Sequence, residues 1–301
     1  QSVGMGSEFY KNFAIVKKIF EEADEKLGFK ISKIILEGPD TELKLTKNTQ
    51  PAILIISYSI FKILENEFGL DKKKIKYFAG HSLGEYSALV CSNSLNFRDA
   101  LFLLHERGKA MQEAVPLGKG SMLAVLGVNI EEINNFISKI SEKKVCEIAN
   151  DNADGQIIIS GETKAIDELK TILKDNNKKN ILLPVSAPFH CSLMQGAAKK
   201  MENKINPTIF KEPVLEIISN VTALPEKDPD KIKKLLVEQI YSKVRWRESI
   251  INISKKGITD FIEIGPGKVL SGLVKRIIKG SNTMSINSVD EIKKIIDEFK
   301  K

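Results

Sequence analysis

The pattern Gly80-His81-Ser82-Leu83-Gly84 places a serine between two glycines. The apolar run of residues 75–79 before it predicts a strand, and residues 83–92 after it predict a helix. A serine at such a strand-to-helix turn presents its hydroxyl outward, while the following helix points backbone N–H groups at the same place. The pattern predicts a nucleophilic Ser82, with the Leu83 N–H stabilising an oxyanion. An ordinary glycine-bounded turn is the alternative interpretation.

A serine hydroxyl needs a general base, and the chain has three histidines. His81 adjoins Ser82, and consecutive side chains at a sharp turn point apart, so it is a poor base. His105 lies within a predicted helix beside Glu106, which favours a structural role. His190 stands where the chain re-enters the larger of two predicted domains, a junction that overlooks a cleft. We therefore predict His190 as the base, with a structural loop histidine as the alternative.

Arg107 falls in the apolar stripe of the predicted helix 96–115. The stripe recurs at three- and four-residue spacing and consists of Ala100, Leu104, Met111 and Ala114. A guanidinium on an apolar face is costly unless it is paired. It could pair with a carboxylate of the protein, or it could hold a substrate carboxylate through two hydrogen bonds. Both interpretations stay open at this point.

Composition sets broad limits on fold and partners. The chain has 301 residues, 42% hydrophobic and 28% charged, with a net charge of +7. This suits a globular protein of one or two domains, and the basic balance favours acidic partners. The three cysteines (Cys91, Cys146 and Cys191) lack metal-ligand spacing, so we expect reduced thiols in a cytosol-like compartment. We expect neither a membrane span nor a signal peptide.

Strand-like and helical segments alternate, which predicts an α/β fold: a mostly parallel sheet with a hydrolase-like core. After the Gly/Pro-rich residues 116–120 the order becomes βαββαβ, the ferredoxin-like unit. We predict a large α/β domain of residues 1–116 and 188–301 and an inserted ferredoxin-like small domain of residues 117–187. The predicted elements are helices 8–28 and 51–68, strand 75–79, helices 83–92 and 96–115, strand 121–128, helix 130–141, strands 145–150 and 156–160, helix 163–175, strand 181–185, helix 191–205, strand 215–219, helices 230–240 and 246–257, strand 260–264 and helix 268–279.

Five segments form a combination that is specific to one enzyme family. They are residues 80–89, 107–112, 187–190, 237–246 and 263–270. Together they resemble the malonyl-CoA:acyl-carrier-protein transacylases of type II fatty acid synthesis, and the resemblance covers essentially the whole chain. It implies transfer of a malonyl group from malonyl-CoA to the phosphopantetheine thiol of an acidic acyl carrier protein. We expect no metal or other cofactor, no nucleic acid, no membrane partner and a monomer.

The resemblance also implies a role for each matching residue. Ser82 would form the malonyl ester and His190 would serve as base. The main-chain carbonyl of Gln239 would orient that histidine, and Arg107 would bind the malonyl carboxylate. The Leu83 N–H would help to hold the oxyanion.

Two further residues are expected at the substrate. Phe189 would narrow the acyl pocket, as in malonyl-selective relatives, and Met122 is a further substrate-binding candidate. The family begins with a strand and a glycine-glutamine-glycine loop, whose glutamine gives a second oxyanion N–H. Residues 1–6 are similar to the stretch just after that loop, so we expect the second donor upstream of Gln1. The expected location is the bacterial cytoplasm, or an organelle such as a plastid if a targeting segment precedes this sequence.

Two other readings of the residues remain. A serine esterase of the α/β-hydrolase class would place its histidine near the C-terminus and would leave Arg107 without a purpose. A non-catalytic module that binds a carrier protein would not need Ser82, His190 and Arg107 together.

Overall fold

The computed structural model describes residues 1–185 and 187–299; Ser186, Lys300 and Lys301, which the predicted domain ranges include, lie outside the described residues. The helices are α1 (Ser7–Asn12), α2 (Ala14–Leu27), α3 (Ile31–Glu37), α4 (Asp40–Leu43), α5 (Thr46–Asn66), α6 (Gly84–Cys91), α7 (Phe97–Glu113), α8 (Ile130–Ile137), α9 (Thr163–Asp175), α10 (Gln195–Ile205), α11 (Pro229–Gln239), α12 (Trp246–Lys255), α13 (Val269–Ile277) and α14 (Val289–Phe299), with 3₁₀ turns at Lys72–Lys74 and Ser192–Met194. The strands are β1 (Tyr77–Ala79), β2 (Gly120–Leu126), β3 (Cys146–Ala153), β4 (Gln156–Glu162), β5 (Lys179–Leu182), β6 (Glu216–Ile218), β7 (Pro225–Glu226), β8 (Asp260–Ile264) and β9 (Asn282–Ile286).

The described strands form three sheets, which together contain both parallel and antiparallel pairs. β1 pairs with β6 and β8 pairs with β9 in parallel, as expected where helices connect the strands. β7 instead pairs antiparallel with β6. A tight turn joins these two strands, with the Ser219 N–H donating to the Leu224 carbonyl, and so short a connection permits only antiparallel pairing. The α/β class is confirmed, with mixed sheets; the mostly parallel sheet with a hydrolase-like core stays a prediction.

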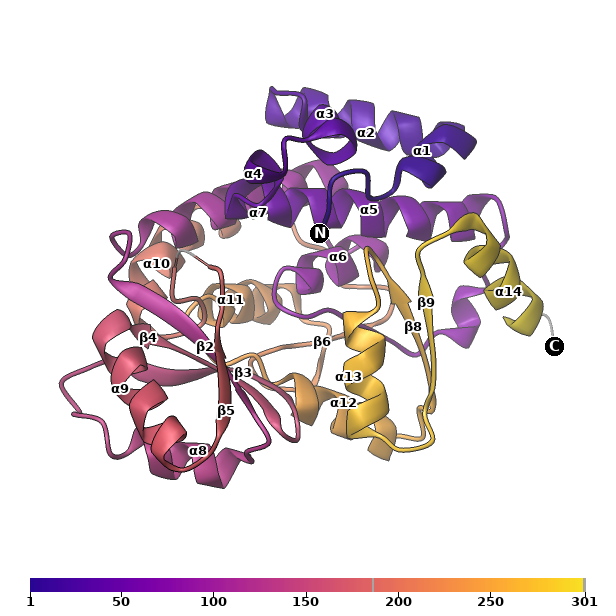
Figure 1. The fold of residues 1–301 in the computed structure, drawn as a ribbon. Coiled ribbons are helices and arrows are strands. Elements are labelled where there is room, and N and C mark those ends of the chain that lie inside the picture. Colours follow the sequence, from indigo (N-terminus) through magenta and orange to yellow (C-terminus); the bar gives the residue numbers. More distant parts are fainter. Residues whose placement is uncertain (186, 300–301) are drawn as a thin grey trace.

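The third sheet has the order β3-β4-β2-β5 and is antiparallel throughout. Figure 1 shows it with α8 and α9 on one side of the molecule. Alternate residues of its strands point to opposite faces. Leu123 and Val125 join the apolar cluster that also contains residues of α8 and α9, whereas Met122 and Ala124 belong to a separate cluster. The sheet therefore presents a second apolar face, away from its own helices.

Two long helices, α5 and α7, pack against each other in the main core (Figure 1). α5 begins at Thr46, five residues before the predicted start, so Pro51 lies inside the helix. A proline has no N–H, so the carbonyl of Lys47 one turn earlier lacks its helical donor. His105 on α7 supplies a replacement, because its Nδ1–H donates to the Lys47 carbonyl at 3.0 Å. The structural interpretation of His105 thus has a physical reason.

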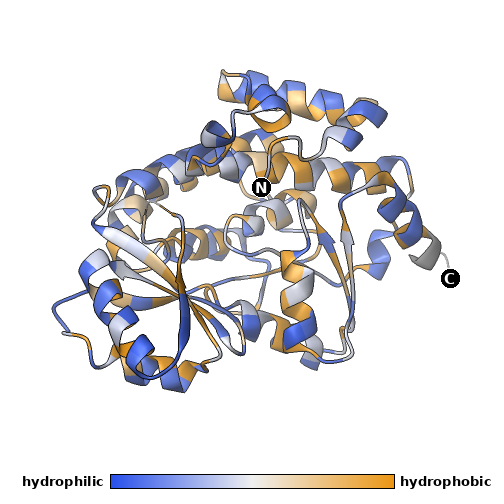
Figure 2. Cartoon of the chain, viewed as in Figure 1, coloured by the Kyte–Doolittle hydropathy of each residue, from blue (hydrophilic) through white to orange (hydrophobic). Residues whose placement is uncertain are grey.

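Several other predicted bounds change. The predicted helix 8–28 is two helices, because Phe13 has an extended backbone (φ −125°, ψ 121°). β3 continues to Ala153, three residues beyond the end of the predicted strand 145–150. β9 and α14 were not predicted. Figure 2 shows hydrophilic and hydrophobic residues alternating along most helices, as expected for helices packed on one face. Within the described ranges, each helix is too short or too polar to cross a bilayer.

Candidate active site

Ser82 occupies the turn between β1 and α6, and its backbone is left-handed, with φ 53°. Few residues other than glycine adopt this conformation, which is typical of a strained functional turn. A side chain at Gly80 would place its Cβ 2.0 Å from the Gly84 carbonyl group. Gly80 is therefore needed for the close approach of the backbone. A Cβ at Gly84 would meet nothing within 4 Å, so the second glycine is not needed for space.

His190 meets Ser82 directly. Its Nε2 lies 2.8 Å from the Ser82 Oγ, and its Nδ1 lies 2.8 Å from the Gln239 main-chain carbonyl oxygen. A carbonyl can only accept, so Nδ1 carries the proton and Nε2 is free to accept from the serine hydroxyl. This tautomer is the one that a general base for Ser82 requires. The predicted base and nucleophile therefore lie in hydrogen-bond contact.

The carbonyl of Gln239 is available because this residue ends α11. The last carbonyls of a helix have no donor within the helix, and His190 takes one of them. Gln239 is fully buried, so the bond is shielded from water. A neutral carbonyl thus fixes the imidazole in place of a carboxylate.

The environment of His190 favours the neutral imidazole. Burial and, second, the positive charge of Arg107 lower its pKa to about 3, against hydrogen bonds that raise it. The imidazole is therefore unprotonated near neutral pH, as a base must be before it accepts the Ser82 proton.

The Arg107 side chain is 1% exposed and reaches the Ser82 hydroxyl from α7. Its Nη2 donates to the Ser82 Oγ at 3.1 Å and to the Gln239 Oε1 at 2.7 Å, and its Nη1 donates to the Gln50 Oε1 at 2.6 Å. The Tyr86 ring lies 5.8 Å from its guanidinium carbon. No carboxylate of the described residues lies within ion-pair distance, and Nε is buried without a partner there. Ser82, His190 and Arg107 are called the reactive trio below.

The reactive trio answers one question that the sequence left open. Arg107 was expected to pair either with a protein carboxylate or with a substrate. Its protein contacts are two neutral amide oxygens, a hydroxyl and an aromatic ring. Such groups orient a buried cation without neutralising it, so the guanidinium can still attract an anion beside the nucleophile.

The predicted oxyanion donor, the Leu83 N–H, lies at the start of α6. The N–H groups of Gly84, Glu85 and Tyr86 bond to carbonyls of the turn, but the Leu83 N–H has no acceptor among the described residues. First-turn N–H groups of a helix are unsatisfied by the helix itself. The Leu83 N–H is therefore free for an oxygen that develops negative charge next to Ser82.

Met122 and Phe189 lie in one apolar cluster, on the face of the four-stranded sheet opposite α8 and α9. Phe189 is half-buried, precedes His190 and also packs against the main core. The structure therefore brings these two predicted substrate residues together beside His190.

His81, by contrast, points away from the trio. Its Nε2 bonds to the Asn152 Oδ1 at 2.8 Å, and its ring lies 5.6 Å from that of Trp246. The expectation that His81 is not the base agrees with these contacts.

The profile of the acyl transferase domain family matches residues 1–300. The chain belongs to the acyl transferase family. It is 42% identical to the malonyl CoA-acyl carrier protein transacylase of Bacillus subtilis strain 168, covering 100% of this chain and 94% of the relative. The corresponding Haemophilus influenzae protein is 37% identical, covering 99% and 95%. The α/β-hydrolase esterase that the sequence left open is therefore wrong.

Solved structures of acyl transferases agree with the fold of the whole chain. The acyl-carrier-protein-S-malonyltransferase from Bartonella henselae has a TM-score of 0.97 and 42% identity, covering 100% of this chain and 96% of that chain. A malonyl-transacylase in complex with its type II PKS acyl-carrier protein has a TM-score of 0.95 and 35% identity, covering 99% and 96%.

Three side chains of this acyl transferase site were not predicted from the sequence. Gln50 holds Arg107, and Asn220 bonds to both sides of the nucleophile turn. Glu85, 3% exposed, accepts from the Gln239 side chain, and burial raises its pKa to about 7 despite bonds from Gln239 and Asn220 that lower it. Glu85 carried a signal, because it is the single charged residue of an otherwise uncharged, buried helix. Gln50 and Asn220 showed no such sequence signal.

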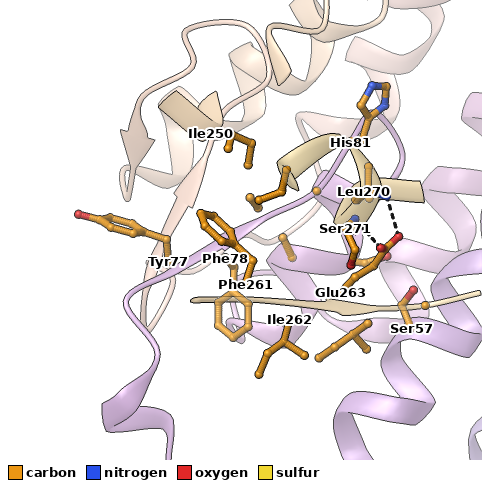
Figure 3. A pocket seen from close by; sticks show the side chains of 18 of the residues that line it. Ser57, Tyr77, Phe78, His81, Ile250, Phe261, Ile262, Glu263, Leu270 and Ser271 are labelled. Atoms are coloured by element: carbon orange, nitrogen blue, oxygen red, sulfur yellow. Dashed lines mark hydrogen bonds between the residues drawn. The ribbon is translucent and has the colours of Figure 1, made fainter. Parts of the chain in front are cut away.

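A cavity of about 970 Å³ adjoins the nucleophile turn and is lined by β1, β8, α5 and α13. Figure 3 shows Phe78 of β1 and Phe261 of β8 among its side chains. β1 and β8 are the outer strands of their sheets in the described part of the chain. Leu83 and Gly84 line this space, whereas the reactive trio does not. The cavity therefore borders the start of α6, not the contact between nucleophile and base.

Proposed function

We propose that this acyl transferase moves a malonyl group from malonyl-CoA to the phosphopantetheine thiol of an acyl carrier protein through a malonyl ester of Ser82. One observation carries the proposal. The Arg107 guanidinium is buried, has no carboxylate of the described residues in ion-pair contact, and places its Nη2 3.1 Å from the Ser82 Oγ. A guanidinium at that distance suits an acyl group that ends in a carboxylate, since charge-assisted bonds to it are strong in a buried site.

In the first half-reaction the Ser82 Oγ attacks the thioester carbonyl while its proton passes to the His190 Nε2. The carbonyl oxygen becomes negative and accepts from the Leu83 N–H. When the C–S bond breaks, the imidazolium returns the proton to the leaving CoA sulfur. The malonyl ester remains on Ser82, with its carboxylate on Arg107.

The second half-reaction repeats these steps with another thiol. The carrier-protein thiol gives its proton to His190 and attacks the ester carbonyl. The C–O bond to Ser82 then breaks, and its Oγ recovers the proton. The Gln239 carbonyl keeps the imidazole in one tautomer throughout and stabilises the imidazolium in both halves.

The substrate walls and the partner surface follow from the same proposal. Met122 and Phe189 would bound the acyl group, because they form an apolar cluster next to His190. The net charge of +7 would favour an acidic carrier protein and the CoA phosphates. The relatives' names support both partners. Three buried, unpaired cysteines suit the predicted cytoplasmic location.

The division of the chain is part of the proposal. We assign residues 117–187 to a small ferredoxin-like domain, supported by its βαββαβ order and by its own apolar cluster. We assign residues 1–116 and 188–301 to the large domain, for which a hydrolase-like core is supported by the strand–Ser82–helix turn. The trio then lies between them, since Phe189 contacts apolar clusters of both.

The proposal is tested by intact mass spectrometry after mixing the protein with malonyl-CoA or acetyl-CoA. The wild-type protein should gain one malonyl group rapidly and an acetyl group much more slowly. Ser82→Ala should gain neither, because the ester oxygen is gone. A malonyl adduct that survives Ser82→Ala would rule out this nucleophile. An acetyl adduct that forms as fast as the malonyl adduct would rule out the role given to Arg107.

A further inference from the structure

Glu85 lies one helical turn after Ser82 and is buried among apolar residues of α6. Burying a carboxyl group costs free energy unless the fold supplies donors for it. Two donors reach its Oε2: the Gln239 Nε2 at 2.7 Å and the Asn220 backbone N–H at 3.2 Å. Neither is a cation, and no ion pair to Glu85 occurs among the described residues. The carboxyl therefore accepts hydrogen bonds from neutral donors only, one at the end of α11 and one in the turn after β6.

Both donors belong to residues that hold the nucleophile turn. The Asn220 Nδ2 donates to the Gly80 carbonyl at 2.7 Å, and its Oδ1 accepts from the Ser82 N–H at 2.7 Å. The Gln239 Nε2 donates to the Ser82 carbonyl at 3.0 Å. Glu85 thus holds the backbone of Asn220 and the side-chain amide of Gln239, the two residues whose side chains bond to the turn at Ser82.

Gln239 also connects Glu85 to the rest of the trio. Its Oε1 accepts from Arg107 and its main-chain carbonyl accepts from His190. An amide side chain could sit with its oxygen and nitrogen exchanged, and only its partners decide. The Glu85 carboxyl and the Ser82 carbonyl are both acceptors and require the NH₂ group on their side. The amide oxygen is then left to face the guanidinium.

We infer that Glu85 is a positioning residue for acyl transfer: its carboxyl fixes the Gln239 amide so that Ser82, Arg107 and His190 are held in one arrangement. The inference rests on the proposed function, because it assigns Glu85 to the same site. Loss of the carboxyl would free the amide to rotate. Arg107 would then face NH₂ hydrogens in part of the molecules and lose its orientation toward a substrate carboxylate.

The test compares Glu85→Ala with Glu85→Gln in the adduct assay, with malonyl-CoA and acetyl-CoA measured separately. Glu85→Ala should slow malonyl adduct formation about 100-fold, the cost of misplacing reacting groups by about 1 Å. It should slow acetylation less, so that the malonyl-to-acetyl ratio falls. Glu85→Gln keeps an oxygen that accepts both bonds and should recover most of the rate and of the ratio.

A double-mutant cycle asks whether Glu85 acts through Gln239. Gln239→Ala removes the amide but keeps the main-chain carbonyl for His190. Adding Glu85→Ala to it should then cost no more than about threefold, far less than in the wild-type background. If Glu85→Ala does not fold, Glu85→Asp, which retracts the carboxyl by one methylene, takes its place in the cycle.

A second buried carboxylate supplies the control. Asp24 in α2 is 8% exposed and accepts from the Ser32 N–H at 2.8 Å and the Ser32 Oγ at 2.6 Å, away from the trio. Asp24→Ala should lower the thermal midpoint without changing the malonyl-to-acetyl ratio.

Additive costs in the cycle, or an unchanged ratio in folded Glu85→Ala, would overturn the inference. A wild-type protein that forms no malonyl adduct would instead overturn the proposed function.

Discussion

Two arginines of this protein, Arg107 on α7 and Arg247 on α12, have opposite surroundings. Arg247 on α12 donates from Nε to both oxygens of Asp151, at 2.9 and 3.1 Å, and that carboxylate is 1% exposed. Arg107 on α7 is more deeply buried and contacts neutral groups instead. The two side chains share one chemistry, but of the two only Arg247 forms an ion pair with a carboxylate of the described residues.

This difference is the one expected between a structural cation and a cation that binds a substrate anion, the role proposed for Arg107. Arg247 joins α12 to β3, where the Asp151 N–H also donates to the Val244 carbonyl. Its hydrogen bond with Asp151 raises its pKa. Burial lowers the pKa of Arg107, with nearby Tyr86 and Glu85 opposing that shift. The Asp151 carboxylate keeps Arg247 from being an unpaired charge, whereas the Arg107 guanidinium has no carboxylate in ion-pair contact among the described residues.

The largest expected effect is that of Arg107→Ala on malonyl transfer. Removing one partner of a buried, charge-assisted pair typically costs about 10²–10³-fold, and the malonyl carboxylate would lose that partner. Transfer of uncharged acyl groups should improve relative to malonyl, because the unpaired guanidinium is gone. Rates of adduct formation from malonyl-CoA and acetyl-CoA measure this ratio. An unchanged preference would show that Arg107 does not bind the carboxylate.

Arg247→Ala should act on stability instead. It leaves the buried Asp151 carboxylate without its partner, which costs about 1–3 kcal/mol in the free energy of unfolding. Urea denaturation measures this loss, and the malonyl-to-acetyl ratio of the folded protein should stay that of the wild type. A changed acyl preference in this variant would remove the distinction between the two arginines.

The smallest effect is a shift in pH dependence. Burial and then Arg107 lower the pKa of His190 to about 3, so adduct formation should stay fast well below pH 6.5. Arg107→Ala should move the acid limb of the residual rate to higher pH, because a cation that disfavours the imidazolium is gone. Arg247→Ala should leave the limb in place. A limb near pH 6.5 in the wild-type protein would contradict the buried, neutral base.

The lowered pKa of His190 also makes the stability of the fold depend on pH. The unfolded chain takes up a proton at this histidine near pH 6.5, whereas the folded chain does so only near pH 3. The stability that neutral His190 permits is therefore present above pH 6.5 and is lost as the pH falls toward 3.

The sequence predicted the reactive trio because each member breaks a local rule. Ser82 stands between glycines, Arg107 lies in an apolar stripe, and His190 follows a predicted domain junction. The helices and strands near them were also predicted, since their apolar periodicity is strong. Residues that break a local rule are the ones for which sequence reasoning carries functional information.

What the sequence did not predict depends on contacts between distant segments. Gln50 and Asn220 are ordinary polar residues until folding brings them to Arg107 and to the nucleophile turn. The three separate sheets could not be predicted, because strand order depends on pairings that no local pattern encodes. The start of α5 was misplaced for the same reason: His105, from another helix, replaces the donor that Pro51 lacks.

Ser82 and His190, with φ of 53° and 59°, are two of the five non-glycine residues with left-handed backbone in the described chain. This conformation costs about 1–2 kcal/mol per residue for most side chains. Selection for heat resistance alone would therefore favour glycine at these positions, which would remove the proposed nucleophile or the proposed base. The presence of serine and histidine at these positions is expected if selection for catalytic turnover outweighs the loss in stability.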